Sequence, residues 1–207
     1  IAWDPGAMAV AEHVSHLLDA RFVAGRVSRL VYDCNRPPSA PDAMPERSEK
    51  VEISGNKGLS QSERDTRTQT VYRPFHRAVQ TMLGLIKEPV IVTLHRFPPV
   101  FNDKTRAVEI GILHDTDRRL ADAMLATAKA HTSNLVQRNQ PYGPQHGVTH
   151  TLQKHAIAPG HLNVMLEIRN DLIKTPRQQE DMAQVLSIWI EDAFSSMHVP
   201  GDVTCRA

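Results

Sequence analysis

The chain has 207 residues, of which 41% are apolar and 23% charged, and its net charge is +1. This composition is typical of a folded domain, offers no broad basic field for a nucleic acid, and contains no apolar run of the ~18 residues that cross a membrane. Two cysteines far apart in sequence exclude a disulfide framework and favour a reducing, cytoplasmic setting. We therefore expect a small-molecule partner, with no nucleic acid and no membrane.

The first third of the chain predicts one helix, one strand and a long loop. Asp4 and Pro5 have the residue types of an N-cap and a first helical position, and apolar residues then recur at helical spacing, which predicts a helix over 5–19. The β-rich segment 28–33 predicts a strand. The segment 37–58 carries four prolines and no sustained periodicity, so we expect a loop over the surface.

The rest of the chain alternates helices and strands. Ser60 and Glu63 have capping-box spacing and open a helix that reaches about residue 86, with Pro74 expected to bend or interrupt it. Strands are then predicted at 89–95, 107–113, 134–139 and 163–169, and helices at 115–130, 149–156 and 176–197. This alternation predicts an α/β fold, a three-layer sandwich in which a mixed, mostly parallel sheet lies between helices.

Polar side chains gather where predicted strands end. They are Asn35 and Arg36 after the first strand, His95 at the end of the second, and Glu167 in the last. The carboxyl ends of parallel strands share one edge of a sheet, where ligands bind in open α/β folds, so these side chains should converge on one cleft. An arginine fork grips a carboxylate, a histidine can bind zinc, and a glutamate among apolar groups can act as a general base. The set therefore favours hydrolysis of an anionic substrate.

Each candidate also has a purely structural interpretation. The two residues after the first strand could form a turn with a surface ion pair. His95 could be a core histidine bonded to the backbone, and Glu167 could pair with Arg169 on the same face of its strand. On local grounds Asp4 is a helix cap rather than a metal ligand, and His150 lies in a polar segment that favours a surface role.

Several segments occur together in a familiar order: IAWDPGA, GRVSRLVYDCNRPPSAPDAMP, GNKGLS, YRPFH, TLHRFPPV, EIGILHD, NQPYGP and LEIRNDLI. In this order the chain resembles the N-formylglutamate amidohydrolase family, in particular its predicted amidohydrolase branch. The resemblance covers essentially all of residues 1–207 and implies a single domain with a zinc-carboxypeptidase-like fold. It also implies hydrolysis of the N-formyl, or another N-acyl, amide of an acidic amino acid such as N-formylglutamate.

The resemblance assigns residues to the substrate. The DCNR motif implies that Asn35 and Arg36 bind the substrate carboxylate, with Arg29 as a second candidate cation. Tyr142 and His150 fall in segments that border the substrate in the family. All five residues are therefore expected to be substrate-binding.

The resemblance also implies one zinc ion. By this resemblance the TLH segment implies that His95 is a zinc ligand, with Asp4 as a second candidate ligand. The LEIRNDL segment implies that Glu167 deprotonates the attacking water and later protonates the leaving amine. Family members carry a strand before the IAWD segment that ends in a motif such as EHASN. We therefore expect that the domain lacks its N-terminal strand here and that a further zinc ligand lies upstream of Ile1.

Two other functions fit the same residues. One is a zinc amidase or peptidase that acts on another carboxylate-bearing substrate, since the sequence does not report the size of the acyl pocket. The other is a metal-free module that captures carboxylates with the same arginines. Metal content and the range of hydrolysed substrates discriminate between these functions.

Overall fold

The central sheet has four strands in the order β3-β8-β6-β7. The computed structural model describes residues 3–48 and 50–197, and within them these strands are β3 (Ile91–Phe97), β6 (Ile110–Leu113), β7 (Val136–Arg138) and β8 (Asn163–Arg169). β3 and β8 are parallel, as are β6 and β7, whereas β6 and β8 are antiparallel. The expected mixed, mostly parallel sheet is confirmed.

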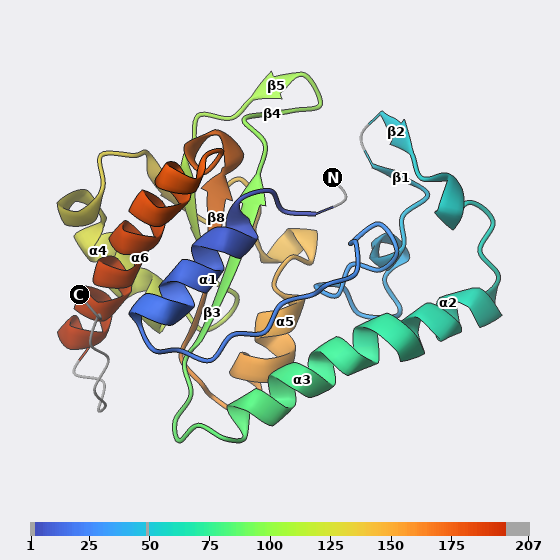
Figure 1. Cartoon of the computed structure of the whole chain (residues 1–207), viewed down its shortest axis with the longest axis horizontal. Coiled ribbons are helices and arrows are strands. Elements are labelled where there is room, and N and C mark those ends of the chain that lie inside the picture. Colours follow the sequence, from blue (N-terminus) through green and yellow to red (C-terminus); the bar gives the residue numbers. More distant parts are fainter. Residues whose placement is uncertain (1–2, 49, 198–207) are drawn as a thin grey trace.

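The larger core lies between one face of the sheet and three helices, α1 (Ala7–Leu17), α4 (Arg119–His131) and α6 (Pro176–Ser196) (Figure 1). Alternate residues of β8 face this core, because side chains of a strand alternate between the two faces of its sheet. These residues are Val164, Leu166 and Ile168, all fully buried. None of the described helices is long and apolar enough to cross a membrane.

A smaller core lies on the opposite face. Met165 of β8 and Leu113 of β6 pack there against α5 (His150–Leu152) and the π-helical turn that follows it, Gln153–Ile157. Leu83, at the end of α3 (Arg73–Leu83), packs on the same cluster. Helical residues thus pack on both faces of a mixed α/β sheet.

The predicted helix over 60–86 is confirmed, with an interruption. Ser60 caps α2 (Gln61–Arg67) in a capping box with Glu63, as the spacing predicted. A π-helical turn, Thr68–Tyr72, separates α2 from α3, and Pro74 is the second residue of α3. Proline lacks a backbone N–H and cannot continue an ordinary helical ladder, which explains why the regular helix is interrupted just before it.

The strand predicted over 28–33 is wrong. The Val31 and Tyr32 amides both donate to the Ser28 carbonyl, which curls the segment into a turn. The Tyr32 ring is 1% exposed and packs 5.4 Å from the Tyr72 ring between the helices. Packing of that ring, rather than pairing with a sheet edge, therefore fixes the path of the chain.

Two further expectations need correction. The N-cap of α1 is Gly6, whose φ of 83° suits glycine, so Asp4 does not cap the helix. The strand predicted over 89–95 begins and ends two residues later, at Ile91 and Phe97, lies at an edge of the sheet and is only partly buried between these two residues.

Several short elements were not predicted, because two-residue strands carry almost no periodicity. The expected surface loop holds a small hairpin and two 3₁₀ turns, and a second hairpin follows β3. These short elements are β1 (Arg47–Ser48), β2 (Val51–Glu52), β4 (Val100–Phe101), β5 (Lys104–Thr105) and the 3₁₀ turns Pro41–Ala43, Ser54–Asn56, Pro144–His146 and Asn170–Leu172.

Candidate active site

His95 and Glu167 lie side by side. The parallel register of β3 and β8 places them opposite each other, and both point away from the face that carries Leu166. Arg169 is not the partner of Glu167, since its guanidinium pairs with Asp171 at 2.8 Å and Glu109 at 3.1 Å. The structural interpretation of Glu167 as half of an ion pair with Arg169 is therefore wrong.

Glu167 is a buried acidic residue with a raised pKa. The residue is only 4% exposed, and no described residue donates a hydrogen bond to its Oε2. Burial raises the pKa of Glu167 to about 7, and the charges of His95, Arg29 and Arg106 offset only part of that rise. A carboxyl with a pKa near neutrality can both take up and release a proton, as a general base requires.

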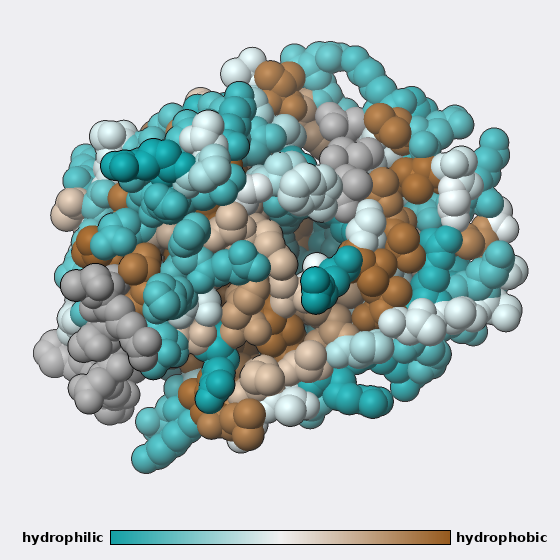
Figure 2. Space-filling model, viewed as in Figure 1, coloured by the Kyte–Doolittle hydropathy of each residue, from teal (hydrophilic) through white to brown (hydrophobic). Residues whose placement is uncertain are grey.

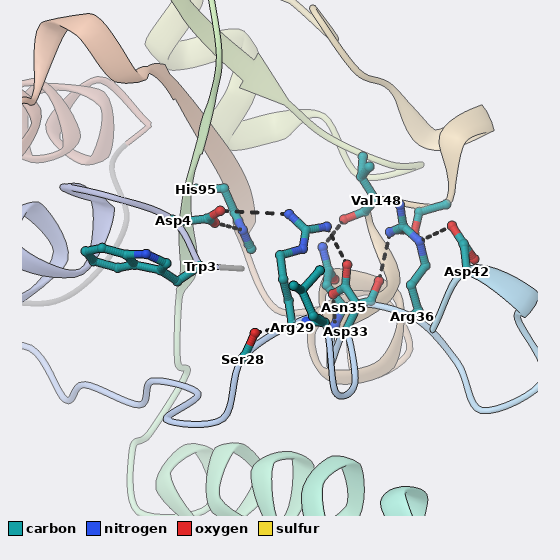
Figure 3. Close-up of polar contacts among 12 residues, drawn as sticks. Trp3, Asp4, Ser28, Arg29, Asp33, Asn35, Arg36, Asp42, His95 and Val148 are labelled. Atoms are coloured by element: carbon teal, nitrogen blue, oxygen red, sulfur yellow. Dashed lines mark hydrogen bonds and ion pairs between the residues drawn. The ribbon is translucent and has the colours of Figure 1, made fainter. Parts of the chain in front are cut away.

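Asp4 contacts His95 instead of capping α1. Its Oδ2 lies 3.2 Å from Nδ1 of His95 (Figure 3). Its Oδ1 lies 3.8 Å from Nε of Arg96. Burial by itself would lower the pKa of His95, but the hydrogen bond and charge of Asp4 outweigh burial and raise it. Arg96 also donates to the Trp3 carbonyl at 3.0 Å, so it holds the segment before α1 against the end of β3.

Arg29 connects this pair to the DCNR turn. Its Nη2 lies 2.5 Å from Oδ2 of Asp33 and its Nη1 lies 3.8 Å from Oδ1 of Asp4. Burial acts to lower the pKa of Arg29, but the charges of Asp33, Asp4 and Glu167 raise it overall. Figure 3 shows the guanidinium between His95 and the turn that carries Asn35.

Asn35 tethers the turn to the segment before α5. Its Nδ2 donates to the Val148 carbonyl, and its Oδ1 accepts from the amide of Thr151 at 2.9 Å and from its hydroxyl at 2.8 Å. The amide oxygen is thus fully used, whereas Nδ2 has a second hydrogen. Asn35 is therefore a positioning group whose remaining N–H can still face a ligand.

Arg36 is fixed along one edge and open along another. Its Nε lies 2.6 Å from Oδ2 of Asp42, and its Nη1 donates to the carbonyls of Asn35 at 3.0 Å and Gly147 at 2.8 Å. No described residue accepts a hydrogen bond from its Nη2. A guanidinium held in this way presents its remaining N–H groups in a fixed direction, which suits a carboxylate. In the space-filling view the middle of this face of the molecule is hollowed (Figure 2).

His150 and Tyr142, both predicted to border the substrate, lie at different places. His150 Nε2 is 2.9 Å from the Tyr72 hydroxyl, and the pKa of His150 is lowered by burial and by the charges of Lys154 and Arg36. The Tyr142 ring instead lies 4.8 Å below the guanidinium carbon of Arg106. The structure thus places His150 near the DCNR turn and Tyr142 near the β4–β5 hairpin.

Two buried histidines that the sequence analysis did not assign to the site, His76 and His155, support the DCNR turn. His76 of α3 lies 2.6 Å from His155 through their ring nitrogens, and its Nε2 lies 2.9 Å from the Cys34 carbonyl inside the DCNR turn. Burial lowers the pKa of both histidines to about 4. His76 lies in the YRPFH segment, which is one of the motifs of the family resemblance, so the sequence could have marked it as a candidate. Its pairing with His155 could not be predicted, because the two residues are 79 positions apart in the chain.

His95 and Asp4 carry the kinds of donor atom that zinc accepts. Imidazole nitrogen and carboxylate oxygen are zinc ligands, and His95 with Asp4 offers one of each. Oε2 of Glu167, in the residue opposite His95, is buried and has no hydrogen-bond partner among the described residues, so it could accept a proton from a bound water. Within 3–48 and 50–197, however, no three His, Cys, Asp or Glu residues are grouped to hold a metal. The donor chemistry of this pair fits zinc, but a catalytic zinc usually has three protein ligands, and the described residues would offer two.

The buried carboxyl of Glu167 beside the imidazole of His95, with guanidinium groups nearby, gives this α/β protein the groups that hydrolases use for proton transfer and for binding an anion. The family model for N-formylglutamate amidohydrolase matches residues 1–174, and the chain belongs to that family.

The chain is also similar to a solved structure, the crystal structure of gene product Atu2144 from Agrobacterium tumefaciens. The two share 51% sequence identity with a TM-score of 0.93, over 95% of this chain and 79% of that one. No curated protein matches the chain. The family expected from the sequence motifs is therefore confirmed by the family model.

Proposed function

We propose that the chain is a metal-dependent amidohydrolase that cleaves the N-formyl amide of an acidic amino acid such as N-formylglutamate, releasing formate and the free amino acid. Family membership supports the reaction class. The single observation that carries the mechanism is the buried Glu167, whose Oε2 has no hydrogen-bond partner among the described residues and whose neighbour across the sheet is His95.

In this mechanism Glu167 moves the protons. Its pKa of about 7 lets Oε2 take a proton from the attacking water and return it to the departing amide nitrogen. A zinc ion held by His95, Asp4 and a third ligand from outside the described residues would activate that water and polarise the acyl oxygen. Arg29, whose charge reaches Glu167 and Asp4, would stabilise negative charge on the acyl oxygen.

Arg36 would orient the substrate. Its Nη2 is the edge of the guanidinium left open by Asp42 and Gly147, and it would bind the α-carboxylate of the amino acid, aided by the second hydrogen of Asn35 Nδ2. Fixing the carboxylate places the scissile amide relative to Glu167, and such positioning contributes as much to rate as the proton transfer itself. His150, whose pKa is affected by the charge of Arg36, would then lie near this carboxylate, and Tyr142, which contacts Arg106, would lie further from it.

The test combines a metal measurement with a formate-release assay on the full-length protein. Glu167→Gln should lower kcat by roughly 10²- to 10⁴-fold and leave bound zinc unchanged, because it removes proton transfer without removing a proposed ligand. Glu180→Gln, an exposed position on α6, makes the same chemical change far from the sheet and should keep full activity.

Three results would count against the proposal. Near-normal turnover by Glu167→Gln with zinc retained would overturn the role of Glu167. Hydrolysis of N-acyl amino acids other than N-formyl ones would favour the broader zinc amidase. Protein that binds amino-acid carboxylates but contains no metal and hydrolyses nothing would favour the metal-free binding module.

A further inference from the structure

Arg106 lies in a cage of aromatic rings. It directly follows β5, and its guanidinium carbon lies 4.5 Å from the centre of the Phe101 ring, 4.8 Å from that of Tyr142 and 5.7 Å from that of Phe97. The rings come from β4, from the segment after β7 and from the end of β3. Contacts on several sides restrict the orientation of a long, flexible side chain and hold its charge in one place.

This cation lacks a carboxylate partner among the described residues, which distinguishes it from Arg29 and Arg36. No described Asp or Glu oxygen lies within ion-pair distance of Arg106, and the hydrogen bond its side chain donates within the described chain is a long 3.5 Å contact to the Pro98 carbonyl. A guanidinium has five N–H groups, and leaving a half-buried cation unpaired is unfavourable. Aromatic rings satisfy its faces but not its N–H edge.

Arg106 is also close enough to affect the proposed base. Its positive charge acts to lower the pKa of Glu167, against the effect of burial. A ligand bound at the N–H edge of Arg106 would therefore lie within electrostatic reach of the buried carboxyl at which the reaction is proposed to occur.

A close backbone contact at Gly111 brings Tyr142 to Arg106. Gly111 of β6 lies opposite Glu167 across the sheet, and a Cβ on it would lie 2.0 Å from the Gln140 carbonyl oxygen. The missing side chain thus lets the segment after β7 run close over the sheet and carry Tyr142 to Arg106. An alanine at the same place would push that segment, and the ring, away from the guanidinium.

We propose that Arg106 binds the side-chain carboxylate of the substrate and thereby selects N-acyl derivatives of dicarboxylic amino acids. This inference rests on the proposed function, because it assumes that Arg36 takes the α-carboxylate. An N-acylglutamate carries two carboxylates, and Arg36 and Arg106 each keep N–H groups that no described carboxylate occupies. Arg29 is already engaged between Asp4 and Asp33.

The experiment compares N-formyl-L-glutamate with N-formyl-L-glutamine, which have nearly the same shape and differ in the side-chain charge. The wild-type protein should prefer the glutamate substrate in kcat/KM, and Arg106→Gln should reduce this preference by roughly 10- to 100-fold, the usual worth of a charge-assisted bond. Lys104→Gln removes the same charge from an exposed position on the same hairpin and should leave the preference within about 2-fold of wild type.

The ratio of the kcat/KM values for the two substrates reports recognition of the substrate side chain alone. Removing Arg106 also changes the pKa of Glu167, but that change slows both substrates alike. Equal losses for both substrates would therefore overturn the proposal and reduce Arg106 to a positioning residue. A wild-type protein without preference for the charged substrate would overturn it with no variant at all.

A binding measurement keeps the test independent of turnover. By calorimetry, the wild-type protein should bind the product L-glutamate more tightly than L-glutamine, and Arg106→Gln should abolish the difference. If no N-formyl amino acid is hydrolysed, the proposed function fails, yet a binding difference lost in Arg106→Gln still supports the carboxylate site, and equal binding overturns it. Arg106→Lys, which keeps the charge but loses the planar fork, should retain part of the preference and serves if Arg106→Gln does not fold.

Discussion

Acidification should release the His76–His155 pair and destabilise the DCNR turn. In the neutral pair His76 donates through Nε2 to the Cys34 carbonyl at 2.9 Å, so its Nδ1 must accept the hydrogen of His155 Nε2 across 2.6 Å. A second proton on His76 would set two N–H groups against each other. Both side chains are buried, with residue exposures of 4% and 7%, so charging either one in the folded structure is unfavourable.

The expected loss follows from the pKa values. Burial, with neighbouring positive charges, lowers the pKa of each histidine from 6.5 to about 4. Between those values the unfolded chain binds more protons than the folded chain, so the free energy of unfolding falls as pH falls. From pH 7 to pH 5 each histidine should contribute a loss of about 2 kcal/mol, and the two together about 4 kcal/mol, which is a large part of the ~5–15 kcal/mol typical of a domain.

Urea unfolding at pH 7, 6 and 5 measures this loss. We compare the wild type with the double variant His76→Gln and His155→Gln, because other titrating groups contribute alike to both and cancel in the difference. The double variant should lose about 4 kcal/mol less than the wild type between pH 7 and pH 5. His13→Gln, an exposed position on α1, should keep the wild-type dependence. A double variant that loses as much stability as the wild type would refute the assignment of acid sensitivity to this pair.

Three further predictions concern the site. Arg36→Gln should raise KM for N-formylglutamate roughly 10- to 100-fold in steady-state kinetics, because it removes a charge-assisted bond to the carboxylate. Asp4→Asn should reduce zinc retained after dialysis against a chelator while the melting temperature stays near that of the wild type, because amides are poor zinc ligands. Gly111→Ala should lower stability by roughly 1–3 kcal/mol in urea unfolding, since its Cβ would meet the Gln140 carbonyl oxygen at 2.0 Å.

Each of these three predictions would be contradicted by a specific result. An unchanged KM in Arg36→Gln would remove Arg36 from substrate binding. Full zinc retention in Asp4→Asn would leave Asp4 as a positioning partner of His95 rather than a ligand. A Gly111→Ala variant as stable as the wild type would mean that the segment carrying Tyr142 does not depend on close approach to β6.

Local patterns explain which elements could be predicted. The helix over 5–19, the strand over 163–169 and the helix over 176–197 are each long enough for apolar spacing to reveal one buried face, and each is present. The segment over 28–33 has an equally β-like pattern, but its buried ring is taken up by Tyr72, 40 positions along the chain, rather than by a strand. Sequence spacing does not report which partner a buried side chain finds.

In the candidate site, too, some features could be predicted from local sequence and others could not. The residue types at the strand ends were readable, and parallel pairing of β3 with β8 brings His95 and Glu167 together as expected. The role of Asp4 was not readable, because Asp before Pro has the same local signature whether its carboxylate caps a helix or contacts a histidine 91 positions away. Arg106 gave no signal at all, since a single arginine after a two-residue strand has no pattern.

By itself, the sequence determined the class of fold, the family and the placement of His95 and Glu167 on two strands of the sheet. These follow from apolar periodicity and from the order of short motifs, both of which are local properties of the chain. Only the tertiary structure decided which charges are paired and which are left open: Arg29 between two aspartates, Glu167 buried without a partner, and Arg106 held by rings. Burial and the pairing of charges depend on distances between residues far apart along the chain, and folding alone sets those distances.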